Sequence, residues 1–165
     1  MQILQGPEVL ERFSIDYFRG ASTFGALSDD TIRWLFNQGR AYALDKGDVL
    51  FEPDERGDAF FVILQGSLAY FKCHEGKYAH IRNYQLGEQI GFMSMIALHN
   101  RVGSAVAHED SIVLEVSTTL FHQLHEQAPQ DFGLLMMNLA REMARTLRSV
   151  DNIVVDKVHD QAENE

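Results

Sequence analysis

The feature that most constrains the fold is a series of short apolar segments between Lys46 and Val116, separated by glycine-marked turns. Runs of about four to eight residues, bounded by turn residues, are typical of β-strands. The turns recur about every ten residues, a spacing typical of β-sandwiches and jelly rolls. Strands are expected at 49–52, 60–64, 67–73, 78–84, 102–107 and 112–116.

Helical patterns flank this β-rich centre. One helix is expected over 7–19, where Pro7 suits a first helical position, and a second after the N-capping residue Ser28. Ser117 can cap a short helix, and a long one is expected from Pro129 to about residue 155. We therefore expect three regions: a β-roll with N-terminal helices (1–128), a long C-terminal helix (129–158) and a disordered acidic tail (159–165).

The composition argues against several classes of protein. The chain has 165 residues, which suits one domain, and 14 basic against 24 acidic residues give a net charge of −10. This acidic balance makes direct DNA binding unexpected. No apolar stretch is long enough for a membrane span, and the first twenty residues do not resemble a secretory signal. Cys73 is the only cysteine, so no disulfide can form within the chain, and a cytoplasmic location is expected.

Residues 86–107, LGEQIGFMSMIALHNRVGSAVA, stand out from the β pattern. Gly87 and Gly91 precede a short apolar, helix-like turn, and Arg101 opens the next strand. A loop with exposed backbone N–H groups facing a guanidinium is an anion site, best suited to phosphate. A glycine-rich turn with one arginine is, however, more often ordinary turn chemistry.

This segment, with KGDVLFEPDERGDAFFVILQGSL upstream, resembles the cyclic nucleotide-binding domain family, specifically the sensor half of the bacterial catabolite activator and fumarate–nitrate regulator group. The resemblance extends from about Phe24 to Val158. It implies a mainly β fold with flanking helices, a double-stranded β-helix (jelly-roll) barrel followed by a long dimerisation helix. It identifies 86–107 with the phosphate-binding cassette, in which Gly91 matches the glycine, Arg101 the phosphate-binding arginine and Ser104 the following hydroxyl residue.

One position departs from the family pattern. Phe92 occupies the slot of the glutamate that binds the ribose hydroxyl, and its bulk is expected where the sugar would lie. Losing a charged hydrogen bond of about 1.5–3 kcal/mol should weaken cyclic-nucleotide binding by one to two decades. The Gly-Phe pair is similar to the fumarate–nitrate branch, but a single cysteine excludes that branch's iron–sulfur cluster.

The predicted ligand-binding residues are Gly91, Phe92, Met93, Arg101, Ser104 and Thr146. The resemblance places Thr146 at the first of two hydroxyl positions that contact the base in cyclic-AMP-binding regulators, with Leu147 at the second; its other interpretation is a helix-surface threonine. Arg101 also has two interpretations. It is either an anion clamp or a structural arginine, paired with a carboxylate or hydrogen-bonded to loop carbonyls.

The long helix carries a heptad-like seam, which predicts a homodimer. Its positions are four and three residues apart, with Thr146 in the remaining slot: Phe132, Met136, Leu139, Met143, Val150 and Ile153. A second stripe, Leu135, Ala144, Leu147 and Val154, lies beside it and is expected to face the barrel.

No enzymatic or metal chemistry is indicated. His122 and His125 share a helix face but lack an evident third ligand, and no nucleophile–base pair is found. We expect a stand-alone, non-enzymatic sensor without the helix-turn-helix domain of its relatives, acting either through a protein partner or as a ligand-binding or competing dimer. Three ligand alternatives stay open: a weakly held cyclic nucleotide, cAMP or cGMP; another small anion or a more apolar molecule; and a vestigial pocket in a protein-interaction module.

Overall fold

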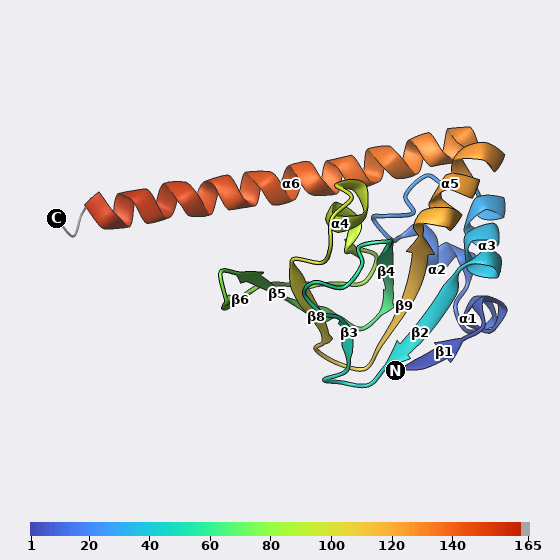
Figure 1. Cartoon of the computed structure of the whole chain (residues 1–165). Coiled ribbons are helices and arrows are strands. Elements are labelled where there is room, and N and C mark those ends of the chain that lie inside the picture. Colours follow the sequence, from blue (N-terminus) through green and yellow to red (C-terminus); the bar gives the residue numbers. More distant parts are fainter. Residues whose placement is uncertain (163–165) are drawn as a thin grey trace.

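A computed structural model describes the backbone of residues 1–162 and the side chains of residues 1–156. Nine strands form two antiparallel sheets in these residues, which confirms the predicted sandwich (Figure 1). The five-stranded sheet has the order β1-β2-β9-β4-β7, and its strands are β1 (Gln2–Leu4), β2 (Arg40–Leu44), β9 (Ser111–Ser117), β4 (Ala59–Gln65) and β7 (Gln89–Ile90). The four-stranded sheet has the order β3-β8-β5-β6, with β3 (Val49–Phe51), β8 (Gly103–Ala107), β5 (Leu68–His74) and β6 (Lys77–Tyr84).

The strand pattern of the sequence located every strand between Val49 and Val116 except the two-residue β7. It did not reveal β1 or β2, which pair with each other and extend the larger sheet beyond β9. In β2, Ala41 and Leu44 are buried and Tyr42 and Ala43 are half-buried, so burial does not alternate from residue to residue. Such a short segment gives little periodic signal.

The N-terminal helical region is split in two. The single helix expected over 7–19 consists of α1 (Gly6–Arg12) and α2 (Ile15–Arg19). The break comes at Ser14, whose hydroxyl accepts a hydrogen bond from the Tyr17 amide and starts a new helix. Serine caps also begin α3 (Asp29–Gln38) at Ser28 and α5 (Thr118–Gln127) at Ser117, as predicted.

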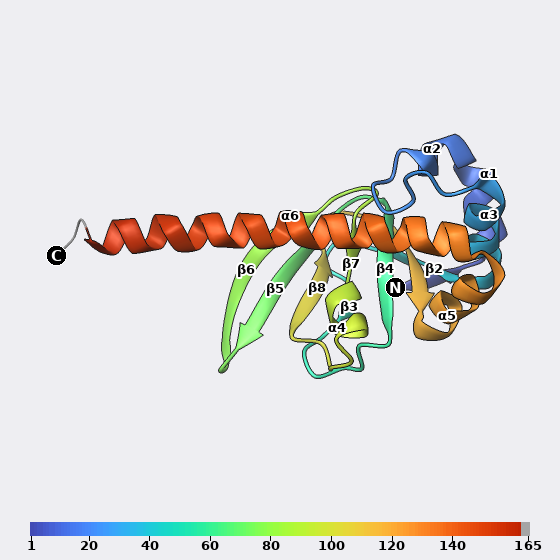
Figure 2. The same ribbon diagram turned by 90° about the horizontal axis from the view of Figure 1, so that it is seen from above.

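The long helix α6 (Pro129–Ala162) passes over both sheets and continues beyond β6 (Figures 1 and 2). Its first half packs on the domain, with Leu135 and Leu139 fully buried, whereas every described side chain from Leu147 onward is exposed. The helix ends four residues later than the expected boundary at 158. Of the predicted acidic tail, 159–162 are helical in backbone, and 163–165 lie outside the described residues.

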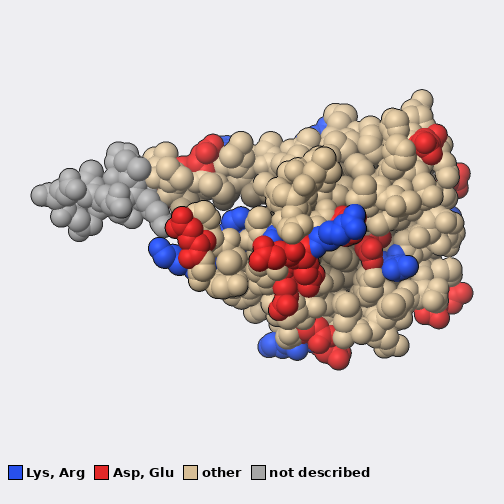
Figure 3. Space-filling model, viewed as in Figure 1, with Lys and Arg blue, Asp and Glu red and all other residues tan. Residues whose placement is uncertain are grey.

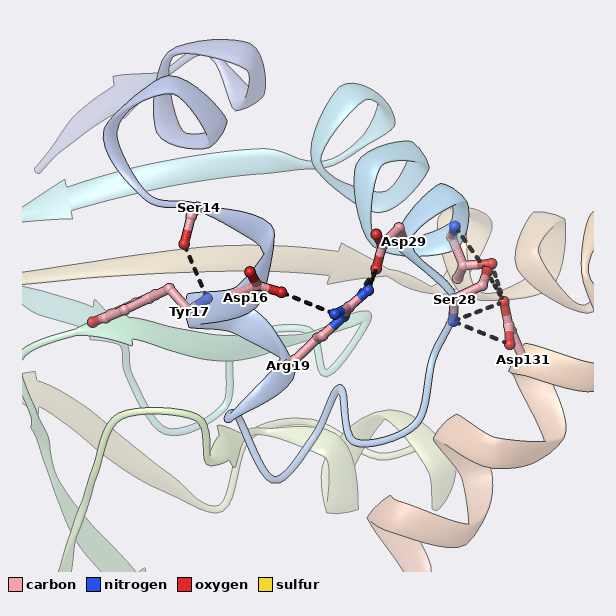
Figure 4. A network of polar contacts seen from close by, with 8 residues as sticks. Ser14, Asp16, Tyr17, Arg19, Ser28, Asp29 and Asp131 are labelled. Carbon is pink, nitrogen blue, oxygen red and sulfur yellow. Dashed lines mark hydrogen bonds and ion pairs between the residues drawn. The ribbon is translucent and has the colours of Figure 1, made fainter.

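Polar contacts attach the start of α6 to the N-terminal region (Figure 4). The Asp131 carboxylate accepts hydrogen bonds from the hydroxyls of Ser28 and Thr31. Two turns further along, the Asn138 side-chain amide donates to the Gly25 carbonyl at 2.7 Å and to the Thr23 carbonyl at 3.2 Å. These bonds fix the base of the helix, whereas its described side chains from Leu147 onward are exposed.

The surface carries charges of both signs. On the face shown in Figure 3, acidic and basic side chains are interspersed, and this face has no continuous basic patch within the described residues. Among the described residues, no helix is both long and apolar enough to cross a membrane.

Candidate ligand-binding site

The loop between β7 and α4 (Phe92–Ile96) is built around Gly91. This residue is the N-cap of α4 and has φ = +95°, a backbone conformation that favours glycine. A Cβ atom at Gly91 would lie 2.6 Å from Nη1 of Arg101. The loop therefore needs a glycine for two reasons, its backbone conformation and the close approach of the arginine.

Arg101 is buried, with 4% of its surface exposed. Its Nη1 donates to the Gly91 carbonyl at 2.9 Å, and its Nη2 donates to the Ala59 carbonyl at 2.7 Å. The guanidinium lies 4.4 Å from the centroid of the Phe51 ring, and burial lowers the pKa of Arg101. These contacts are those of an arginine hydrogen-bonded to loop carbonyls, and the described residues provide it with no carboxylate partner.

The side chain of Phe92 packs in the core. It is fully buried, and its ring packs edge-on against Phe60 at 5.4 Å and Phe121 at 6.0 Å between centroids. Phe92 also lines the cavity described below, so the expectation that its bulk lies where a sugar would bind stays a prediction. As the first residue of α4, Phe92 fixes the short helix to the barrel through its aromatic contacts.

A cavity of about 520 Å³ lies between the four-stranded sheet, α4 and α6. Four of the predicted ligand-binding residues line it: Gly91, Phe92, Met93 and Thr146. Among the described residues, the cavity wall does not include Arg101 or Ser104. Arg101 is turned toward the Gly91 and Ala59 carbonyls, and Ser104 pairs with Phe71 across the β5–β8 ladder. The structure thus places only four of the six predicted ligand-binding residues around the cavity.

The sequence analysis missed the charged end of this cavity. Arg82 on β6 and Glu142 on α6 both line it, together with Tyr84. Arg82 donates to Glu88 at 2.8 Å, lies 3.9 Å above the centroid of the Tyr84 ring, and is 4.0 Å from Glu142. Burial and the neighbouring Glu88 raise the pKa of Glu142 to about 7. A signal was present in the sequence, because Glu142 follows Leu135 and Leu139 at helical spacing on the buried face.

The predicted dimer seam divides into two parts. Leu139 is fully buried in the domain's own core, and Phe132, Met136 and Met143 pack partly buried against that core. Val150 and Ile153 are about half exposed, at 47% and 53%. The second stripe is also divided, because Leu135 faces the barrel as expected, whereas Ala144, Leu147 and Val154 are exposed. Within the predicted seam, Val150 and Ile153 are thus the most exposed positions, and the dimer contact itself stays a prediction.

A second cavity, of about 530 Å³, lies on the other side of α4, between Met95, His99 and the start of α5. It contains none of the predicted ligand-binding residues. The cavity beneath α6 is therefore the candidate site.

Comparisons with known proteins agree with this architecture. The sequence model described as "Cyclic nucleotide-binding domain" matches residues 43–128, more than half of the chain. The cyclic AMP receptor protein of Thermus thermophilus is 27% identical over 136 residues, which are 81% of this chain and 60% of that protein. Lysophospholipase NTE1 of Phaeosphaeria nodorum is 27% identical over 120 residues, but these are 8% of its length. The chain thus spans less than two thirds of either relative, and so small a share of the lysophospholipase does not transfer its activity.

Solved structures share the fold. A cyclic nucleotide-binding domain from Methylobacillus flagellatus superposes with a TM-score of 0.76 at 24% identity, covering 92% of this chain and 88% of that one. The catabolite activator protein of Thermus thermophilus gives a TM-score of 0.69 at 25% identity, covering 81% of this chain and 61% of that one. The sandwich with its N-terminal helices and long α6 is thus the fold of these proteins, and this chain belongs to the cyclic nucleotide-binding domain family.

Proposed function

We propose that this domain senses a small molecule that occupies the cavity beneath α6, and that the position of α6 is its output. The observation that carries the proposal is the composition of the cavity wall. Tyr70 and Arg82 come from the sheet, Met93 from α4, and Glu142 and Thr146 from α6. A ligand in this space contacts barrel and helix at once, so its binding favours one position of the helix over others.

The ligand is proposed not to be a tightly held cyclic nucleotide. Arg101 does not line the cavity, and its guanidinium already donates to the Gly91 and Ala59 carbonyls. A phosphate in the cavity would therefore meet the guanidinium only if the side chain turned away from these carbonyls. Leaving a buried acceptor unpaired costs about 1–3 kcal/mol, so each displaced carbonyl would weaken binding by roughly one to two decades. In calorimetry we expect cyclic AMP and cyclic GMP to bind more weakly than micromolar. Micromolar binding that is abolished by Arg101→Ala would contradict this part of the proposal.

The sensor mechanism is tested with a neutral apolar dye, N-phenyl-1-naphthylamine, which becomes fluorescent in apolar cavities. We expect it to bind the wild type and to slow hydrogen exchange in residues 143–156. Thr146→Trp should fill the cavity and abolish both effects, whereas Met137→Trp, on an exposed position of the same helix, should retain them. Dye binding without any change in helix exchange would contradict the proposal, as would no difference between the two variants.

The exposed distal part of α6 supports a homodimer as the form in which this output is read. Leu147, Val150 and Val154 recur at helical spacing and are 62%, 47% and 55% exposed. Such a stripe is suited to a second copy of the same helix related by two-fold symmetry. A protein partner acting on the same stripe is the alternative, and the oligomeric state in solution separates the two.

A further inference from the structure

Two polar atoms in the wall of the cavity stand out because they are buried and have no hydrogen-bond partner among the described residues. They are Nε of Arg82 and Oε1 of Glu142. Glu142 is 9% exposed. An unpaired buried polar group costs about 1–3 kcal/mol, and native proteins contain few of them. Oε1 of Glu142 is an acceptor without a donor, and it is this atom that points to a missing hydrogen-bonding partner in the cavity.

Arg82 forms only a long ion pair with Glu142 and lies closer to Glu88. Nη2 of Arg82 donates to Oε1 of Glu88 at 2.8 Å, and its guanidinium lies over the Tyr84 ring. Glu142 lies 4.0 Å from the same Nη2, beyond hydrogen-bond distance. Two carboxylates therefore share one cation, which leaves an excess of negative charge at Glu142. Lys72 lines the cavity from β5, but it is joined to neither carboxylate by an ion pair within the described part of the chain.

The rest of the wall is largely apolar. Tyr70, Ile90, Met93 and Met143 face the same space as Glu142, and the Tyr70 and Tyr84 rings meet edge-on at 6.3 Å between centroids. This surface suits an aromatic or aliphatic body, with one polar end directed at the charged cluster.

Building on the sensor function proposed above, we infer that the cavity takes a hydrophobic amine, whose protonated nitrogen donates to Glu142 and whose apolar body packs against the tyrosine and methionine side chains. The ammonium group supplies the missing donor for Oε1 and offsets the excess charge of the two carboxylates. An anionic ligand in the same pose would face Glu142 directly, which opposes its binding. The site therefore prefers a cationic ligand to an anionic one, whereas a phosphate site prefers an anion.

The test compares two probes with the same ring and opposite charge. Tryptamine and indole-3-propionate are used to displace N-phenyl-1-naphthylamine from the wild-type chain at pH 8, where Glu142 is ionised. We expect tryptamine to displace the dye at a concentration at least tenfold lower. Glu142→Gln, which keeps the shape and removes the charge, should reduce this preference about tenfold, because hydrogen bonds to charged groups contribute about 1.5–3 kcal/mol. Glu11→Gln, exposed on α1, is the control and should leave the preference unchanged.

Equal displacement by the two probes would overturn the inference, and so would tighter binding of indole-3-propionate or a preference unaltered in Glu142→Gln. Dye binding to both proteins establishes that the variant is folded and that its cavity is accessible. If the dye binds and alters α6 but the amine preference is absent, the sensor proposal stands and only the ligand class is wrong. If the dye does not bind the wild type, the sensor proposal itself fails.

Discussion

The guanidinium of Arg101 and the carbonyl of Gly91 are joined by a hydrogen bond of 2.9 Å that fixes the entry to β8 against the start of α4. The same guanidinium bonds the Ala59 carbonyl at the start of β4. One side chain thus joins three segments of the barrel, which gives it a structural role whether or not it ever meets a ligand.

Arg101→Ala should therefore destabilise the domain. It leaves two buried carbonyls without their donor and opens a space over the Phe51 ring, so we expect a loss of about 2–4 kcal/mol in the free energy of unfolding by urea denaturation. Arg148→Ala, exposed on α6, should change it by less than about 0.5 kcal/mol. Equal stability of the two variants would show that the Arg101 bonds contribute nothing.

Gly91→Ala and Gly133→Ala form a matched pair. Gly91 has φ = +95° and a Cβ there would meet Arg101, so alanine should cost at least about 1–2 kcal/mol. Gly133 lies in α6 with open space around it, so alanine should stabilise the helix by about 0.5–1 kcal/mol. Thermal melts of the two variants should move in opposite directions, and a shift of both in the same direction would contradict this assignment.

Glu142 should make stability fall as pH rises. Its pKa is about 7 in the folded protein against an ordinary value of 4.5, so the folded state binds the proton more tightly. This loss in the free energy of unfolding is absent below about pH 4.5 and grows as the carboxyl ionises in the unfolded chain. It is complete above about pH 7, where it reaches up to roughly 3 kcal/mol.

Glu142→Gln should remove this pH-dependent loss of stability, because the amide does not ionise. Urea titrations should find it close to wild type at pH 4.5 and more stable than wild type at pH 8. A difference that does not vary with pH would mean that the carboxyl titrates normally.

Asp131 ties α6 to α3 through the Ser28 and Thr31 hydroxyls. Asp131→Ala should cost about 1.5–3 kcal/mol, because the lost bonds are to a charged group. It should also speed hydrogen exchange at the N-terminal turn of α3. Asp151→Ala, exposed further along α6, serves as the control and should do neither.

Glutamate substitutions on the distal part of α6 should prevent dimerisation of the chain without unfolding it. Leu147→Glu with Val154→Glu should yield a folded monomer in analytical ultracentrifugation, because both side chains are exposed. Leu139→Glu should unfold the domain instead, because Leu139 is fully buried in its core. A double variant that remains dimeric would place the contact elsewhere.

Local patterns predicted much of this fold from the sequence. The glycine turns located the strands of the sandwich, and Ser28, Ser117 and Pro129 located the starts of three helices. These signals depend on neighbours a few residues apart, since a cap or a strand alternation is a short-range property of the chain. The resemblance of residues 86–107 to the phosphate-binding cassette led to the correct family, and four of the six predicted ligand-binding residues line the cavity.

Only the tertiary structure decided what the charged residues do. Arg101 bonds a carbonyl 42 positions away, and Arg82 meets Glu142 across the space between the sheet and α6. Phe92 turns inward because Phe60 and Phe121 lie there, a fact that no spacing within the cassette contains. Periodicity indicates which residues share a face of one element, but the partner of that face is set by how distant elements pack. The sequence therefore determined the family and the elements, and the packing of α6 on the barrel determined the chemistry of the cavity.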